Sequence, residues 1–125
     1  MSTEYFQRRQ NKLRSKLAKE NLDGMLVTNL THIRYLCGFT GSSATLLISG
    51  DKVHFITDGR YVVQSEKEVK GANIIIDSIP HIEVIKNQNL LTLGSKIAFD
   101  GNSVSHQAYK QLSKVLSNQQ LENIT

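Results

Sequence analysis

Residues 30–61 read LTHIRYLCGFTGSSATLLISGDKVHFITDGRY, and this stretch decides the fold. Its first part has Ile33 and Leu36 at helical spacing, and Gly38 stands where a helix commonly ends. Two β-rich runs follow, separated by a Gly-containing loop of hairpin length, over residues 44–48 and 53–57. We therefore predict a helix, a tight loop and an antiparallel hairpin in immediate succession.

On the N-terminal side of this stretch, the pattern predicts one more helix and one more strand. Phe6, Leu13 and Leu17 recur at helical spacing, which predicts an amphipathic helix over residues 4–21. A short apolar run over residues 25–28 is suited to a buried strand. Either Asn29 or Thr31 can cap the helix that begins the central stretch.

On the C-terminal side, helices and strands alternate. A helix is predicted from Gly59 to about Lys70, and the three isoleucines of the strand over 73–77 predict burial on both of its faces. Further segments are a helix over 82–91, a strand over 96–100, a helix capped by Ser103 whose apolar face is Val104, Ala108, Leu112 and Val115, and a strand over 120–124. The order predicts an α/β domain with a mixed β-sheet and helices on both faces.

Length and composition limit the classes of protein to which this chain can belong. The chain of 125 residues predicts one domain, and its single cysteine, Cys37, forms no internal disulfide and is expected to be a small buried hydrophobe. No apolar segment is long enough for a membrane span, so a cytoplasmic location is expected. The net charge of +4 is a modest excess that favours an anionic partner without proving one.

Two motifs in the central stretch carry a resemblance to a known family. They are YLCGFTGS at residues 35–42 and TDGRY at residues 57–61. In this order and at this separation they resemble the N-terminal, non-catalytic domain of the creatinase, prolidase and Xaa-Pro aminopeptidase family, whose two-domain metallopeptidases cleave the bond before a proline. The resemblance covers the chain from about Tyr5 to Leu121.

The resemblance implies that the parent protein has two domains with different roles. Residues 1–125 would be the creatinase/prolidase-type N-terminal domain, and the catalytic C-terminal domain would be absent from this chain. That missing domain would hold two divalent metal ions, expected to be manganese, through two Asp, one His and two Glu. This chain would then contribute no catalytic or metal-binding residue and would be inactive alone.

The resemblance also implies partners and a branch of the family. The parent enzyme would be a homo-oligomer, a dimer or a tetramer, acting on proline-containing peptides, with neither membrane nor nucleic acid as a partner. We favour an Xaa-Pro aminopeptidase over a dipeptidase because residues 39–43 lack the acidic and histidine residues that dipeptidase relatives tend to place there.

Arg60 is the most informative single residue. After Asp-Gly at the end of a strand, an arginine offers five N–H donors to a carboxylate in fixed geometry. One interpretation is that Arg60 pairs with Asp58 and locks the turn; the other, implied by the resemblance, is that it approaches the substrate at a domain or subunit junction. The candidate substrate-proximal or interface residues are Phe39, Thr40, Gly41, Ser42, Asp58, Arg60 and Tyr61.

Sequence patterns do not favour a metal site at the histidines or at the strand-end aspartates. The four histidines, His32, His54, His81 and His106, are scattered over different predicted elements. Asp58, Asp77 and Asp100 each follow a strand and could gather around Mg²⁺, but turn and cap bonds are the favoured interpretation.

Two features are typical of nucleic-acid binding in other proteins. Gly38 and Gly41 match the GxxG spacing of a KH loop, but a loop that leads from a helix into an apolar strand favours a tight connection instead. The first helix carries a basic stripe, expected to be a solvated face, made of Arg8, Arg9, Lys12, Arg14, Lys16 and Lys19. The alternatives that remain are a small basic module for RNA or another anion, and a stand-alone dimerisation domain.

Overall fold

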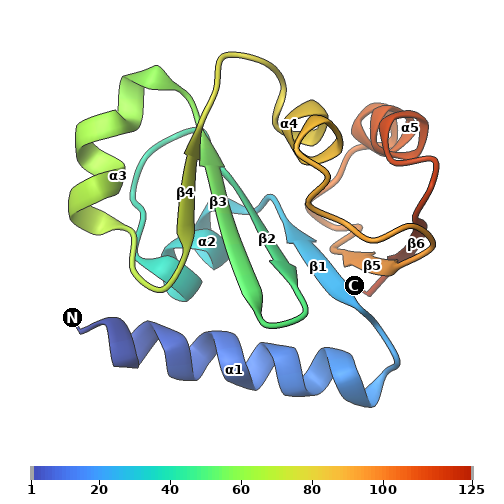
Figure 1. Cartoon of the computed structure of the whole chain (residues 1–125), viewed down its shortest axis with the longest axis horizontal. Helices are drawn as coiled ribbons and strands as arrows, with labels where there is room; N and C mark the ends of the chain where they lie inside the picture. The colour runs from blue at the N-terminus through green and yellow to red at the C-terminus, as the bar shows by residue number, and fades with distance from the viewer. Residues whose placement is uncertain (1, 125) are drawn as a thin grey trace.

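The computed structural model describes residues 2–124, and at its centre is a six-stranded mixed sheet (Figure 1). The strand order is β4-β3-β2-β1-β5-β6. β1, β2 and β3 are antiparallel to one another, whereas the β3–β4, β1–β5 and β5–β6 pairs are parallel. The strands are β1 (Gly24–Val27), β2 (Thr45–Ser49), β3 (Lys52–Thr57), β4 (Asn73–Ile76), β5 (Lys96–Phe99) and β6 (Gln120–Asn123).

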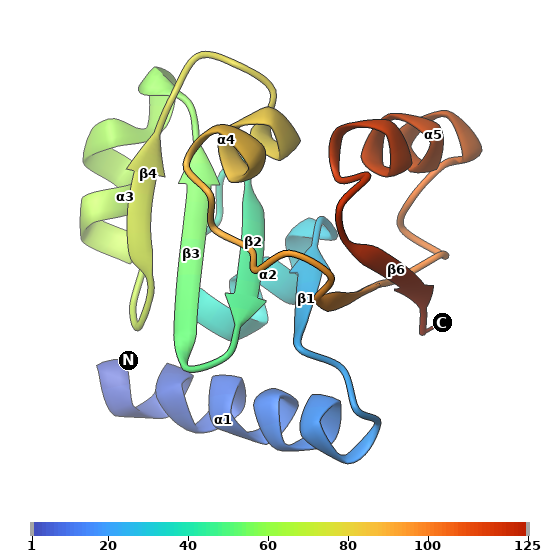
Figure 2. The same cartoon turned by 45° about the vertical axis from the view of Figure 1, so that its right-hand side comes forward.

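Helices cover both faces of this sheet (Figure 2). The helices are α1 (Thr3–Lys19), α2 (Leu30–Cys37), α3 (Val62–Glu68), α4 (His81–Asn87) and α5 (His106–Val115), with a 3₁₀ turn, η1 (Gly59–Tyr61), before α3. One core contains side chains of α1 and α2 and the sheet residue Leu46, and the other contains side chains of α4 and α5 and the next residue, Leu47. This alternation follows from the two-residue period of a strand and confirms the predicted fold class.

The helix, loop and hairpin of the central stretch are confirmed. The Asn29 side chain caps α2 by accepting a hydrogen bond of 3.1 Å from the His32 N–H. Gly38 ends α2 with a φ of 90°, which is a left-handed conformation that favours glycine. In the β2–β3 hairpin, Leu46 lies opposite Phe55 and Ile48 lies opposite Val53.

The prediction that the strand of three isoleucines is buried on both faces is confirmed only in part, since Ile74 is half-buried against the α1 and α2 core. β4 is an edge strand, paired only with β3. Ile75 is buried against the α4 and α5 side of the sheet, whereas Ile76 is 38% exposed. An edge strand has a neighbour on one side only, so side chains at its end remain open to solvent.

Two helices end earlier than predicted. α3 ends at Glu68 rather than near Lys70, since Val69 is extended and the Lys70 N–H donates to the Cys37 carbonyl. α4 ends at Asn87 instead of continuing to residue 91, and Asn89 takes a left-handed φ of 52°.

The cap predicted for the last helix was also wrong. Ser105, not Ser103, caps α5 by accepting from the Ala108 N–H at 3.0 Å. The Ser103 hydroxyl instead donates to the Asp100 carboxylate and accepts from the Asn29 amide. Ala108 is exposed, so Leu112 is the fully buried residue of the predicted apolar face.

Cys37 is a buried residue of the core, as predicted. Its side chain is fully buried, and this burial raises the pKa of the thiol to about 11. The thiolate that would act as a nucleophile is therefore suppressed at neutral pH. Among the described residues, no helix combines the length and apolar character that a membrane crossing requires.

Candidate functional site

The loop that follows α2 is anchored in the core by Phe39. This ring is 1% exposed and lies edge-to-face against Phe55 of β3, with the ring centroids 4.8 Å apart. It also lies edge-to-face against Tyr61 of η1, at 5.2 Å. Phe39 therefore connects the first predicted motif to the second through the interior of the protein.

The polar contacts of Tyr61 join the same two motifs at the surface. The Ser42 N–H donates to the Tyr61 hydroxyl at 3.1 Å, and the two hydroxyls also hydrogen-bond each other. These bonds to Ser42 lower the pKa of Tyr61. Next to them, the Thr57 hydroxyl donates to the Ser43 carbonyl at 2.6 Å. Residues 39–43 and 57–61 thus form one braced unit.

Gly41 lies between the two aromatic rings of this unit. A Cβ at this position would lie 2.3 Å from the Phe39 ring and 2.8 Å from the Tyr61 ring, which is far inside van der Waals contact. Gly41 is therefore required by a close approach, as predicted for the GxxG spacing, and the surrounding geometry is that of a tight connection between a helix and a strand.

Thr40 is held by a contact with α3 that no sequence pattern predicted. The Thr40 N–H donates to the Glu68 carboxylate at 2.8 Å, and its hydroxyl donates to the same group at 2.9 and 3.0 Å. The Gln64 amide donates to both partners. Partial burial opposes ionisation of Glu68, but these hydrogen bonds outweigh it and lower the pKa of the carboxyl.

Asp58 and Arg60 form a two-pronged ion pair within the turn. Arg60 Nε lies 2.9 Å from Asp58 Oδ1, and Nη2 lies 2.9 Å from Oδ2. The Arg60 backbone N–H also donates to Oδ1 at 3.0 Å. The guanidinium carbon lies 5.2 Å from the centre of the Tyr61 ring, and the Arg60 side chain is 66% exposed. The local pairing of the first interpretation is therefore present, and the outer edge of the guanidinium faces solvent.

The ion pair between Asp58 and Arg60 leads to a testable prediction about the pKa of Asp58. The Arg60 side-chain and backbone hydrogen bonds lower the pKa of Asp58 from 3.8 to about 2. A depressed carboxyl pKa stabilises the folded turn above about pH 4, and this contribution disappears as the pH falls through about 2. We expect a carbon-detected NMR titration of Asp58 to have its midpoint near pH 2, and Arg60→Gln to move it back toward the ordinary value. The exposed Arg8→Gln is the matched control, and an equal shift in both variants would contradict the assignment.

The metal hypothesis for the strand ends is not supported by the geometry. Asp77 accepts from the N–H groups of Ser78 and Ile79, and Asp100 accepts from the Asn102 N–H, so each closes its own turn. Within residues 2–124, no three His, Cys, Asp or Glu side chains are placed to hold a metal ion. The donor set of the metal ions that the family resemblance implies is thus not found in the described part of the chain.

The basic stripe of α1 is partly used within the molecule. The Arg9 guanidinium lies over the rings of Tyr5 and Tyr35, at 3.9 and 4.0 Å, and donates to the Tyr35 carbonyl at 2.8 Å. Arg14 Nε donates to the Gly50 carbonyl at 2.6 Å. Two of the six basic residues therefore fasten α1 to α2 and to the β2–β3 turn.

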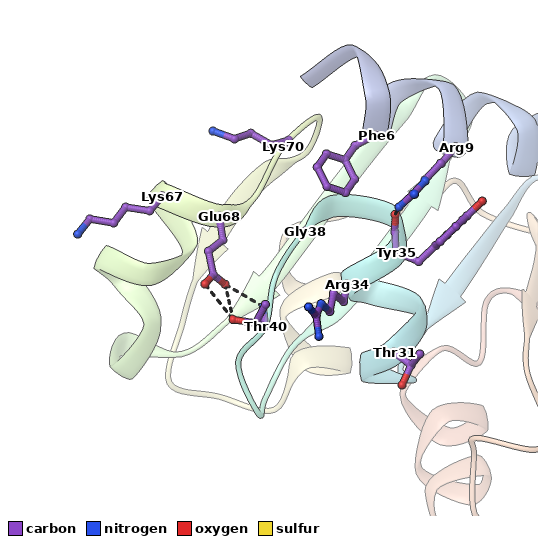
Figure 3. Close-up of a pocket in the computed structure, with 10 residues that line it drawn as sticks. All are labelled: Phe6, Arg9, Thr31, Arg34, Tyr35, Gly38, Thr40, Lys67, Glu68 and Lys70. Carbon is purple, nitrogen blue, oxygen red and sulfur yellow. Dashed lines mark hydrogen bonds between the residues drawn. The ribbon is translucent and has the colours of Figure 1, made fainter. Parts of the chain in front are cut away.

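A pocket of about 490 Å³ adjoins the braced unit (Figure 3). It lies where α1, α2 and α3 meet, and Thr40 and Glu68 belong to its wall. Its other lining residues are Phe6, Arg9, Thr31, Arg34, Tyr35, Gly38, Lys67 and Lys70. Tyr35, Gly38 and Thr40 belong to the predicted motif of residues 35–42, and the other lining residues lie outside both motifs because the pocket forms only when three helices pack together.

Comparison with known proteins assigns the chain to a family. The model of the creatinase/prolidase N-terminal domain matches residues 9–125. The chain belongs to this family. An uncharacterized peptidase of Bacillus subtilis, YqhT, is 40% identical over 111 residues, which are 88% of this chain and 31% of YqhT.

Solved structures show the same creatinase/prolidase N-terminal fold. The N-terminal domain of a putative metallopeptidase from Corynebacterium diphtheriae matches with a TM-score of 0.86 and 33% identity, over 96% of each chain. An Xaa-Pro dipeptidase from Bacillus anthracis matches with a TM-score of 0.84 and 28% identity, over 94% of this chain and 34% of that one. The chain thus spans about a third of the length of YqhT and of the Bacillus anthracis enzyme.

Proposed function

We propose that this chain is the non-catalytic N-terminal domain of a proline-specific metallopeptidase, an Xaa-Pro aminopeptidase or dipeptidase. Its role would be to support assembly of a cytoplasmic homo-oligomer and to shape the access of proline-containing peptides to a dinuclear metal site in another domain. The family membership and the relatives described above support this proposal. The observation that carries it is the braced unit, in which Tyr61 and Phe39 hold two surface motifs in one fixed arrangement.

Within this role, Arg60 is the residue proposed to meet the substrate or a partner subunit. Its side chain gives two of its five N–H donors to Asp58, so three remain directed to solvent. Asp58 and the Tyr61 ring hold the guanidinium in place, which reduces the conformational entropy lost when it binds a carboxylate or a carbonyl. Such preorganisation suits a contact across a domain or subunit junction.

The rival proposal is a small basic module that binds RNA. Fewer features of the structure support it. Arg9 and Arg14 make contacts inside the molecule, and the Arg9 guanidinium occupies one face of each of the neighbouring Tyr5 and Tyr35 rings. RNA binding should appear as salt-dependent affinity for arbitrary oligonucleotides, with several phosphate contacts. Affinity of that kind, together with a downstream reading frame that lacks metal ligands, would favour the rival.

The proposal predicts different results for this chain and for its parent. With added Mn²⁺, the chain alone should not cleave an Xaa-Pro peptide. Arg60→Ala should leave its unfolding free energy nearly unchanged, because an exposed ion pair contributes little to stability. In the parent enzyme the same substitution should lower kcat/KM at least several-fold, since a charge-assisted contact contributes about 1.5–3 kcal/mol.

Arg8→Ala on the exposed side of α1 is the matched control in both assays. If Arg60→Ala unfolds the chain while the kinetics of the parent barely change, Arg60 is a structural lock only. If the reading frame beyond residue 125 encodes no set of two Asp, one His and two Glu, the peptidase proposal itself is wrong.

A further inference from the structure

The pocket between α1, α2 and α3 carries an excess of positive charge. Four cationic side chains and one carboxylate line it, which gives a net charge of +3. The carboxylate belongs to Glu68, and its two oxygens already accept hydrogen bonds from Thr40 and Gln64. Glu68 is therefore part of the wall, and the pocket as a whole attracts anions.

Only one of the four cations is both close to the pocket interior and without a partner. The Arg9 guanidinium is held by Tyr5 and Tyr35. Lys67 and Lys70 extend from the α3 segment away from the interior (Figure 3). Within residues 2–124 the Arg34 side chain makes no hydrogen bond or ion pair, although its backbone carbonyl accepts from the Gly38 N–H, and the side chain is close enough to Glu68 to contribute to the lowered pKa of that carboxyl. Arg34 is thus the cation available to a ligand.

The remaining surface of the pocket is largely apolar. The lining includes the Phe6 ring, whose residue is 6% exposed, the backbone at Gly38, and the Tyr35 ring, whose residue is 52% exposed and which holds Arg9 over one face. Thr31 lies three residues before Arg34 on α2, so its hydroxyl and the guanidinium are on the same side of the helix (Figure 3). The combination is an apolar wall with one bidentate donor and one hydroxyl.

We propose that this pocket binds a monoanionic carboxylate carried on an apolar body about the size of one residue, such as the C-terminal residue of a peptide. The carboxylate accepts two hydrogen bonds from the Arg34 guanidinium and one from the Thr31 hydroxyl, and the apolar body packs against Phe6 and Tyr35. A phosphate ion fits less well because it has no apolar body to contact the Phe6 and Tyr35 rings. This site is independent of the proposed peptidase role, and its test needs no catalysis.

The test is an NMR titration of the 125-residue chain with 3-phenylpropionate, with 3-phenylpropionamide as the neutral analogue of the same shape. We expect a dissociation constant on the order of millimolar, as is usual for a fragment of this size, and amide shifts at Thr31, Arg34, Gly38 and Thr40. The neutral analogue should bind about fivefold more weakly or not at all. Inorganic phosphate at the same ionic strength should cause smaller shifts.

Variants separate this site from general attraction to a basic protein. Arg34→Gln should weaken 3-phenylpropionate binding about fivefold or more, and Arg34→Lys should be intermediate because lysine keeps the charge but loses the planar fork. Lys86→Gln on α4, across the sheet, should leave binding unchanged. Equal binding of the acid and the amide, equal binding of phosphate, shifts centred on other residues, or an unaffected Arg34→Gln variant would each overturn the proposal.

Discussion

Replacement of Phe39 by alanine should lower the free energy of unfolding by about 3–5 kcal/mol, the range for truncating a buried aromatic side chain. The ring is 1% exposed, and it contacts the Phe55 ring of β3 and the Tyr61 ring of η1. Its loss leaves a cavity under the loop and removes two edge-to-face contacts. Urea denaturation followed by circular dichroism measures this change.

Val63→Ala on α3 is the matched control for Phe39→Ala. Val63 is 62% exposed, so its truncation should change the unfolding free energy by no more than about 0.5 kcal/mol. If Phe39→Ala costs as little as this control, Phe39 does not anchor the loop. The braced unit would then depend on the surface hydrogen bonds alone.

Gly41→Ala should cost about 1–3 kcal/mol, as expected for overpacking against buried side chains. The added methyl group overlaps the rings of Phe39 and Tyr61, and Phe39 is enclosed by the core and has little room to move. The loop should therefore shift and break the hydrogen bonds between Ser42 and Tyr61. Because those bonds lower the pKa of Tyr61, an ultraviolet titration should show this pKa rising toward its ordinary value.

Gly59→Ala, in the neighbouring turn, is the control for Gly41→Ala. A Cβ on Gly59 meets no atom within 4 Å, so this variant should remain within about 0.5 kcal/mol of the wild type and keep the pKa of Tyr61 unchanged. A Gly41→Ala variant that matches Gly59→Ala in both measurements would show that the loop adapts without cost.

The sequence predicted the residues of the braced unit but not all of its contacts. Phe39, Gly41 and Tyr61 belong to the two contiguous motifs that carry the family resemblance, so the sequence alone indicated them. The hydrogen bond from Thr40 to Glu68 joins residues 28 positions apart, and no sequence pattern around either residue predicts it. The same holds for Arg34, which becomes a pocket residue only because α1 and α3 pack on either side of the C-terminal end of α2.

The sequence by itself determined the order of helices and strands, the central hairpin and the family, because each depends on neighbours within a few residues. The tertiary structure alone decided that β4 is an edge strand, since three isoleucines indicate burial but not which strands lie on either side. It also decided that α3 stops at Glu68, because the Lys70 N–H bonds to the Cys37 carbonyl rather than continuing a helix. Local sequence sets what each segment can form, and the partners brought together by folding select among those possibilities.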